Sequence, residues 1–359
     1  MPLTRQIVPL PKTKDGFTVT NPNVVLSLSE GKDGLYISGI HRRRQPSENL
    51  LPSESELKFL WKLHLRNSIG RSKSITSEGI HPTSQIETSP DGSKILHLGW
   101  EKVRSLDIVV KATIRVKPDE PLIAMRISVD NLSIYSLAQI DFPVILGIGP
   151  LSDNPEEDKL IWPRMTGQLV PNPYENHIAY DAGYHYPSMT QAIQVTGVYG
   201  NRGGLYLAAH DPDCWAKRLK VYGSIDGTSL NFYLEDYPEN IGSGGNDYDM
   251  HYDAVIGTFN GDWWEAAQLY RDWALKQRWC RPTTVLEDRN FSETMKETVL
   301  WLVLNRKPAV VEEEALAMKS YFGVKCSMQR RGTPLPRNIS RRRRVSKTWS
   351  PISRKLVWR

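Results

Sequence analysis

The sequence predicts a mainly β protein, a large antiparallel β-sandwich followed by a C-terminal helical linker. Short apolar stretches that alternate with polar residues recur from residue 24 to residue 259, separated by turn signals. No segment before Asp262 has the 3.6-residue apolar period of a helix, and a strong helical pattern begins at that residue. Many strands with short turns and no helix between them are typical of an antiparallel sandwich.

Composition and charge narrow the class of protein. The 359 residues are 40% hydrophobic, and no run of 18 apolar residues predicts a membrane span. Cys214, Cys280 and Cys326 are far apart, and the first residues lack the apolar core of a signal peptide, so we expect a cytoplasmic protein without disulfides, metal or cofactor. Eleven Lys and Arg and no acid lie in residues 329–359, and subtracting eleven from the net charge of +6 leaves −5 for residues 1–328. An acidic body argues against nucleic acid as its partner.

The first half of the chain is predicted to be an arm followed by strands. Residues 1–14 form the arm, and Asp33-Gly34 and Asp91-Gly92 are turn signals between strands. The linker 117–121 joins two long strands as a hairpin. The predicted strands cover residues 24–28, 35–38, 57–65, 95–100, 106–116, 122–129 and 140–145.

The second half continues in strands, interrupted by polar insertions at residues 172–187 and 237–247. The second insertion is glycine-rich, but it lacks the Lys-Ser/Thr pair of a P-loop and precedes a strand, which argues against phosphate binding. The predicted strands cover residues 192–199, 204–209, 218–222, 229–234 and 252–259.

A helix is predicted over residues 262–278. Asp262 is a suitable N-cap, Glu265 completes a capping box, and Pro282 ends the helical segment. One face of this helix is apolar and is expected to pack outside the sheets; it carries Trp263, Ala266, Ala267, Tyr270 and Ala274.

Four motifs resemble an uncharacterised family of glycoside-hydrolase-like proteins. They lie at residues 162–173, 186–191, 203–213 and 261–274, and the last, Gly-Asp-Trp-Trp followed by Tyr-Arg-Asp-Trp-Ala, is the most specific. The resemblance covers roughly residues 15–324. It implies a galactose-mutarotase-like β-supersandwich followed by a (β/α)8 barrel.

The resemblance also sets the expected domain boundaries. The supersandwich would span residues 15–260 and the helical linker residues 261–296. Residues 297–324 would be the first β/α unit of the barrel, with a strand at 297–304 and a helix at 311–323. The remainder of the barrel has no counterpart in this sequence.

Residues 325–359 are expected to be a basic, disordered tail, because they show no apolar period and no acid from Gln329 onward. The tail can be a solvated segment, a nucleic-acid or membrane patch, or a product of translation out of frame. We favour the last interpretation. Shifting the codons of residues 345–357 by one base permits a loop followed by an amphipathic helix that ends on glycine, as an α/β barrel requires.

Aromatic and polar side chains gather in the first insertion and predict a carbohydrate contact, because sugars are held by aromatic faces and polar groups. We favour the other interpretation, in which this tyrosine-rich loop packs the sandwich against its lost barrel and His210 and Asp211 cap a turn at a strand end. A mutarotase-like pairing of Glu175 with His185 or His210 is a further alternative that the spacing does not require. The candidate contact residues are Tyr174, His177, Tyr180, Asp181, Tyr184, His185, Tyr186, His210 and Asp211.

The resemblance therefore implies the N-terminal accessory sandwich of a carbohydrate-active protein, truncated before its catalytic barrel. The alternative is a stand-alone carbohydrate-binding or interaction module. No catalytic residue is assigned, because glycosidases need two carboxyl groups flanking the bond, and residues 305–308, which follow the predicted barrel strand, contain no acid. The next acids, Glu312, Glu313 and Glu314, are typical first-turn residues of a helix.

Overall fold

The computed structural model divides the chain into two compact units, residues 1–279 and residues 280–359. The residues that it describes are 12–13, 16–52, 55, 57–165, 167–175, 185–188, 190–224, 226–280, 286–297, 300–304, 313–314, 316–318, 320–321 and 326–330. Most of the predicted N-terminal arm, residues 1–11 and 14, lies outside them.

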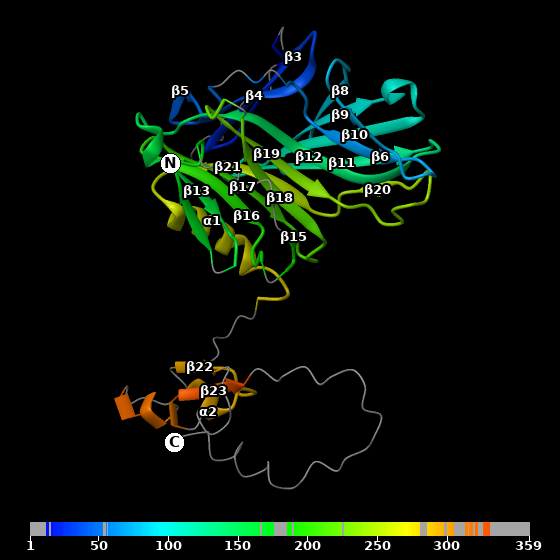
Figure 1. The fold of residues 1–359 in the computed structure, drawn as a ribbon. Helices are drawn as coiled ribbons and strands as arrows, with labels where there is room; N and C mark the ends of the chain where they lie inside the picture. The colour runs from blue at the N-terminus through cyan, green and yellow to red at the C-terminus, as the bar shows by residue number, and fades with distance from the viewer. Residues whose placement is uncertain are drawn as a thin grey trace, which may run out of the picture. The chain divides into compact units, whose positions relative to one another are not determined.

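The first unit is an antiparallel β structure of three sheets (Figure 1). The largest sheet has ten strands in the order β14-β13-β16-β17-β21-β11-β10-β9-β8, with β20 paired to β11. Its strands are β8 (Thr83–Thr88), β9 (Lys94–Trp100), β10 (Ile108–Val116), β11 (Ile123–Asn131), β13 (Lys159–Trp162), β14 (Gln168–Pro171), β16 (Val195–Gly200), β17 (Gly203–His210), β20 (Tyr248–Asp249) and β21 (Asp253–Phe259).

A six-stranded sheet in the order β15-β18-β19-β12-β6-β7 forms the second layer. Its strands are β6 (Lys62–Arg66), β7 (Ser72–Thr76), β12 (Ser136–Ile148), β15 (His185–Tyr186), β18 (Lys217–Gly223) and β19 (Leu230–Asp236). The third sheet runs in chain order through β1 (Lys12–Thr13), β2 (Gly16–Thr20), β3 (Val24–Gly31), β4 (Gly34–Arg42) and β5 (Gln45–Asn49).

One hydrophobic core joins the three sheets. Side chains alternate between two faces of a strand, and in β10 every second position is buried, as the sequence pattern predicts. Trp61 and Trp100 meet edge to face in this core, with ring centroids 5.6 Å apart. The prediction of an antiparallel β-sandwich is confirmed.

The helix α1 (Trp263–Ala274) lies on the outer face of the ten-stranded sheet. The Asp262 carboxylate accepts a hydrogen bond from the Trp264 amide at 2.9 Å, so the predicted N-cap is confirmed. Ala266 and Tyr270 are buried against β16, β17 and β21.

Two details of the helix prediction are wrong. The helix ends at Ala274 rather than 278, because the amides of Lys276 and Gln277 bond to carbonyls three residues back and tighten the chain into turns. Trp263 is 42% exposed, since its ring packs edge to face on Trp264 rather than on the sheet.

The sequence analysis missed short, polar edge strands. All six residues of β8 are exposed, so this strand has no alternating pattern to detect. The strand predicted over residues 57–65 begins only at Lys62. Before that point the Leu60 amide donates to the Ser77 hydroxyl at 2.8 Å instead of to a neighbouring strand.

The second unit contains a parallel strand pair. Strand β22 (Leu300–Leu304) pairs with β23 (Cys326–Arg330), and the described residues between 313 and 321 are helical. The helix α2 (Glu293–Lys296) precedes β22. Residues 326–330, which the sequence analysis assigned to a basic tail, thus form a strand, and residues from 331 onward lie outside the described part of the chain.

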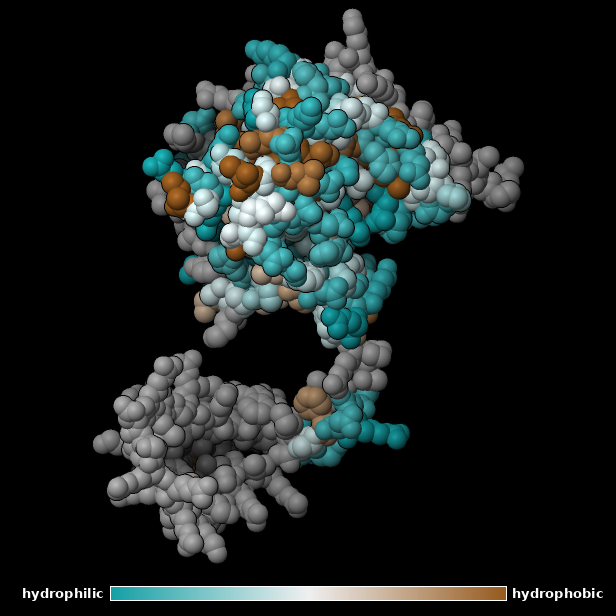
Figure 2. Space-filling model, turned by 90° about the vertical axis from the view of Figure 1, so that its right-hand side faces the viewer, coloured by the Kyte–Doolittle hydropathy of each residue, from teal (hydrophilic) through white to brown (hydrophobic). Residues whose placement is uncertain are grey.

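The described surface of the first unit is mixed in polarity. On the face shown in Figure 2, hydrophobic residues are interspersed with a larger hydrophilic area. Within the residues that the structure describes, no helix combines the length and apolarity needed to cross a bilayer.

Candidate functional site

The structure describes five of the nine predicted contact residues and does not gather these five in one site. His177, Tyr180, Asp181 and Tyr184 lie outside the described residues. Tyr174 is only 2% exposed, and its hydroxyl donates to the Gly149 carbonyl at 2.8 Å and lies 2.7 Å from an Asp158 carboxylate oxygen. Tyr174 therefore belongs to the core and offers a carbohydrate no surface, which corrects the prediction for this residue.

His210 is a packing residue at the end of β17. Its ring stacks on Trp273 of α1 with centroids 4.6 Å apart, and its Nε2 lies 3.2 Å from the Tyr206 hydroxyl. Burial lowers the pKa of His210 to about 4, so the ring is neutral at pH 7. A neutral, stacked ring supports the attachment of α1 to the sheet.

Asp211 caps the turn that leads from β17 to β18, the alternative that the sequence analysis favoured. Its carboxylate accepts hydrogen bonds from the amides of Asp213 at 2.9 Å and Trp215 at 2.6 Å. The same carboxylate pairs with the ammonium group of Lys217, and both side chains are almost completely buried.

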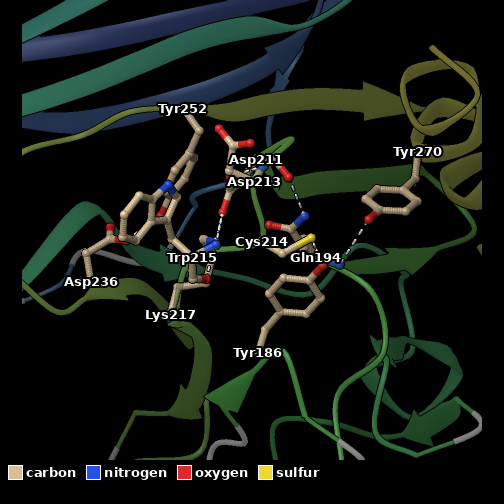
Figure 3. Close-up of polar contacts among 10 residues, drawn as sticks. All are labelled: Tyr186, Gln194, Asp211, Asp213, Cys214, Trp215, Lys217, Asp236, Tyr252 and Tyr270. Atoms are coloured by element: carbon tan, nitrogen blue, oxygen red, sulfur yellow. Dashed lines mark hydrogen bonds and ion pairs between the residues drawn. The ribbon is translucent and has the colours of Figure 1, made fainter. Parts of the chain in front are cut away.

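Aromatic rings surround this buried ion pair. Figure 3 shows Trp215, Tyr252 and Asp236 on one side of Lys217 and Tyr186 on the other. The Lys217 ammonium lies 4.4 Å from the Tyr252 ring centroid and 5.2 Å from that of Tyr186. Burial lowers the pKa of Lys217, although Asp211 opposes the shift.

Asp236 is the second carboxylate of the buried cluster. One of its oxygens accepts a hydrogen bond from the Tyr252 hydroxyl, and the group is only 2% exposed. Burial raises the pKa of Asp236 to about 7, while the Tyr252 hydrogen bond and the Lys217 charge act in the opposite direction.

The six-stranded sheet carries Lys217 and Asp236 on its inner face. A row of polar and charged side chains crosses its opposite, outer face. Strand register places His185 beside Arg218, Arg218 beside Glu235, Glu235 beside Asp141, and Asp141 beside Lys62. These five residues belong to five different strands, and we call them the transverse row. Of the predicted contact residues, His185 is the one that belongs to it.

Glu235 organises one half of the transverse row. Arg218 approaches its carboxylate with Nε at 2.9 Å and Nη2 at 3.1 Å, Lys220 lies at 3.8 Å, and the Tyr237 hydroxyl donates to it at 3.2 Å. The Tyr237 hydroxyl in turn lies 3.1 Å from Nε2 of the exposed His185. Burial raises the pKa of Glu235.

Asp141 organises the other half. It accepts a hydrogen bond from the Gln139 amide at 2.7 Å and lies 3.0 Å from Nε2 of His64. The Ser74 hydroxyl is 3.2 Å from the other ring nitrogen of His64. Asp141 and Glu235 are therefore two adjacent carboxylates whose oxygens are occupied by protein donors.

The arrangement suits hydrogen bonding to a polyhydroxylated ligand. Buried carboxylates hold His185, Tyr237, Lys220 and His64 at or near the surface, where their donors are positioned. Sequence analysis found His185 but missed Tyr237, Lys220 and His64. Polar residues at alternate strand positions are typical of any solvent-exposed sheet face, so these residues gave no distinct signal. The two adjacent carboxylates become visible only once the register of β12 and β19 is known.

Comparison with known proteins finds one family model. A domain of unknown function, DUF6259, matches residues 248–331, which include α1. No curated protein matches the chain.

Solved structures of glycosidases share the fold. The α-N-acetylgalactosaminidase NagBb from Bifidobacterium bifidum matches 88% of this chain at 10% identity, with a TM-score of 0.60 for its GalNAc complex and 0.57 for its ligand-free form. The α-galactosidase from Lactobacillus brevis matches 89% of this chain at 9% identity and a TM-score of 0.50. The chain spans about half the length of these enzymes, 51% of the first and 49% of the second. The resemblance predicted from the sequence is thus confirmed at the level of the fold.

Proposed function

We propose that the first unit is the accessory sandwich of a glycoside-hydrolase-like protein and that the transverse row contacts its carbohydrate. The fold shared with about half of an α-N-acetylgalactosaminidase supports the accessory role. The contact is supported by one observation above all: His185, Arg218 and Glu235 form a continuous polar array on an outer sheet face.

The geometry favours contact rather than bond cleavage. Glycosidases need one carboxyl group that donates a proton and another that attacks or activates water. The side chains of Asp141 and Glu235 are 3% and 5% exposed, and their oxygens already accept bonds from protein donors. These carboxylates hold other side chains in place, and hydrolysis would take place on another domain.

A stand-alone carbohydrate-binding module remains the second candidate, because the transverse row is complete within one unit. The DUF6259 match ends at residue 331, which supports our proposal that the natural reading frame differs beyond it. Sequencing the gene past codon 359 separates the two candidates. Barrel sequence in another frame supports the accessory role, and its absence in all frames favours the module.

We further propose a cytoplasmic location, since Cys214 and Cys280 are free thiols.

Matched histidine variants test the contact. His185→Ala removes a ring of the transverse row whose Nε2 lies 3.1 Å from the Tyr237 hydroxyl. His97→Ala removes a partly exposed ring, whose Nε2 lies 3.0 Å from the Glu87 carboxylate on the ten-stranded sheet. In a glycan-binding assay of the full chain, we expect His185→Ala to weaken binding about twofold to tenfold, the worth of one hydrogen bond, and His97→Ala to leave it unchanged. Equal effects of the two variants would contradict the proposal.

A further inference from the structure

We propose that two copies of this chain pair through strand β8 and join their ten-stranded sheets into one. Strand β8 is the last strand of its sheet, and within the described residues it pairs with β9 alone. All six of its residues are exposed. This surface belongs to a different sheet from the transverse row, so the inference goes beyond the proposed carbohydrate contact.

The turn after β8 determines which of its backbone groups face β9. The Ser89 amide donates to the Ser93 carbonyl at 2.8 Å, so these two residues form a hydrogen-bonded pair. Bonded and non-bonded pairs alternate along an antiparallel ladder, so Glu87, Gln85 and Thr83 also bond to β9. The backbone groups of the other β8 residues therefore point away from β9. These residues are Ser84, Ile86 and Thr88.

The outer edge of β8 lacks the features that usually keep sheet edges apart. Natural sheets prevent edge-to-edge pairing with lysine, with proline or with very short edge strands. In the first unit, β14 ends on Pro171, β7 contains Lys73, β5 contains Pro46, and β1 and β15 have two residues each. Strand β8 has six residues, and none is Lys, Arg or Pro. Its outward N–H and C=O groups meet no partner in the described part of the chain, so they can pair with another strand.

The sequence of β8 is self-complementary about Ile86. When two copies meet antiparallel on a two-fold axis at this residue, Ile86 faces its own copy and Ser84 faces Thr88. These are the residues with outward backbone groups, so each pair exchanges both of its backbone hydrogen bonds. Between them Gln85 faces Glu87, which places an amide opposite a carboxylate and avoids a pair of like charges.

The Ile86 side chain explains why the partner is a second copy. In the sheet it lies beside Leu96, which is buried in the core, yet Ile86 itself is 39% exposed. In the two-fold pair the two Ile86 side chains are direct cross-strand neighbours and cover each other's apolar surface. The charged residue of β8, Glu87, lies on the other face, with its carboxylate 3.0 Å from Nε2 of His97. It therefore stays outside the apolar contact.

The test is sedimentation of the full chain over a range of concentrations, with hydrogen exchange of the β8 amides in the same samples. One strand per copy makes a small interface, so we expect a dimer with a dissociation constant on the order of 100 µM. As the dimer forms, the amides of Ser84, Ile86 and Thr88 should become protected from exchange. The amides of Gln85 and Glu87 should change little, because they already bond to β9 in the monomer.

Matched proline variants locate the contact. Ile86→Pro removes an outward N–H and leaves the hydrogen bonds to β9 in place, so it should weaken the dimer about tenfold or more. Ser72→Pro is the control on edge strand β7. The Asn67 amide donates to the Arg71 carbonyl at 3.0 Å, so by the same alternation the Ser72 amide points out of that sheet. The control should leave the dimer unchanged, and near-UV circular dichroism checks that both variants are folded.

Two substitutions of Gln85 test the register. Gln85→Glu places a like charge opposite Glu87 of the other copy, and Gln85→Lys places an opposite charge there. At low salt the first should weaken the dimer and the second should strengthen it, each about twofold to tenfold. High salt should reduce both effects. Should Ile86→Pro change the circular dichroism, Gln85→Glu on the exposed outer face decides instead.

Four results would overturn the proposal. They are a chain that stays monomeric at every concentration, a dimer that Ile86→Pro leaves intact, growth beyond the dimer, and equal effects of the two Gln85 variants. Growth beyond the dimer counts against it because a two-fold pair uses both β8 edges. None of these results depends on sugar binding, so this proposal and the proposed carbohydrate contact can fail separately.

Discussion

Replacing Asp236 by asparagine should change the pH dependence of folding by a predictable amount. The pKa of this buried carboxyl group is about 7 in the folded chain and 3.8 in the unfolded one. Between these values the folded state binds more protons, so the group's contribution to stability is complete below pH 3.8 and is lost as the pH rises through 7. Each unit of pKa difference corresponds to about 1.4 kcal/mol, so between pH 5 and pH 8 the contribution falls by about 2–3 kcal/mol.

The assay is urea unfolding of the parent chain and of Asp236→Asn, followed by tryptophan fluorescence at pH 5 and pH 8. Other titrating groups are common to both proteins and cancel in the difference between them. The variant should carry a constant cost at both pH values, because an asparagine side chain does not titrate and the lost hydrogen bonds are the same at each pH. The parent should then lose about 2–3 kcal/mol more than the variant on going from pH 5 to pH 8. A difference that does not depend on pH would refute the assignment of a raised pKa to Asp236.

Three further predictions concern the buried cluster, the helix contact and activity. Lys217→Met should destabilise the chain by about 3–5 kcal/mol, because it leaves the Asp211 carboxylate buried without its cation, and Asp211→Asn in the same chain should recover most of the loss in urea unfolding. Full destabilisation in the double variant would argue against a paired charge. His210→Phe keeps the stacked ring but removes a group whose pKa falls from 6.5 to about 4 on folding, so the parent's stability is present above pH 6.5 and is lost as the pH falls toward 4. The parent should lose about 2–3 kcal/mol more than His210→Phe between pH 8 and pH 4.5 in thermal or urea unfolding, and parallel curves would contradict this. The 359-residue chain should not release the aryl group from a panel of aryl glycosides above the buffer rate; turnover that survives Glu312→Gln, Glu313→Gln and Glu314→Gln would place chemistry in the sandwich.

The strands of the core were predictable because their burial follows their sequence. Strand β10 alternates buried and solvent-facing residues, and its predicted range of 106–116 differs from the observed one by two residues. Strand β8 was missed because no side chain of it is buried, so backbone hydrogen bonds to β9 alone define it. The helix start at Asp262 followed from local capping chemistry, whereas its end depended on turns that propensity does not encode.

The candidate site was predictable only in part. Spacing along the chain placed His185 and Tyr186 in a polar insertion, but neighbours in a strand point to opposite faces of the sheet. His185 therefore joins the transverse row, while the Tyr186 hydroxyl donates to Cys214 in the buried cluster at 3.1 Å. Glu235 and Asp236 are also neighbours in one strand and point to opposite faces. Glu235 belongs to the transverse row, and Asp236 belongs to the buried cluster. Asp141 and Glu235 are 94 positions apart, and only the register of β12 and β19 brings them together.

The most direct test of the proposed carbohydrate contact is a chemical-shift map of the full chain titrated with galactose and N-acetylgalactosamine. We predict that the amides of His185, Arg218, Glu235 and Tyr237 shift together with one affinity, and that Tyr237→Phe weakens this affinity by removing a donor held by Glu235. Amides of β8 and β9, around Glu87 and His97, should not move. An absence of shifts along the transverse row at saturating sugar, or shifts confined to other strands, would contradict the account.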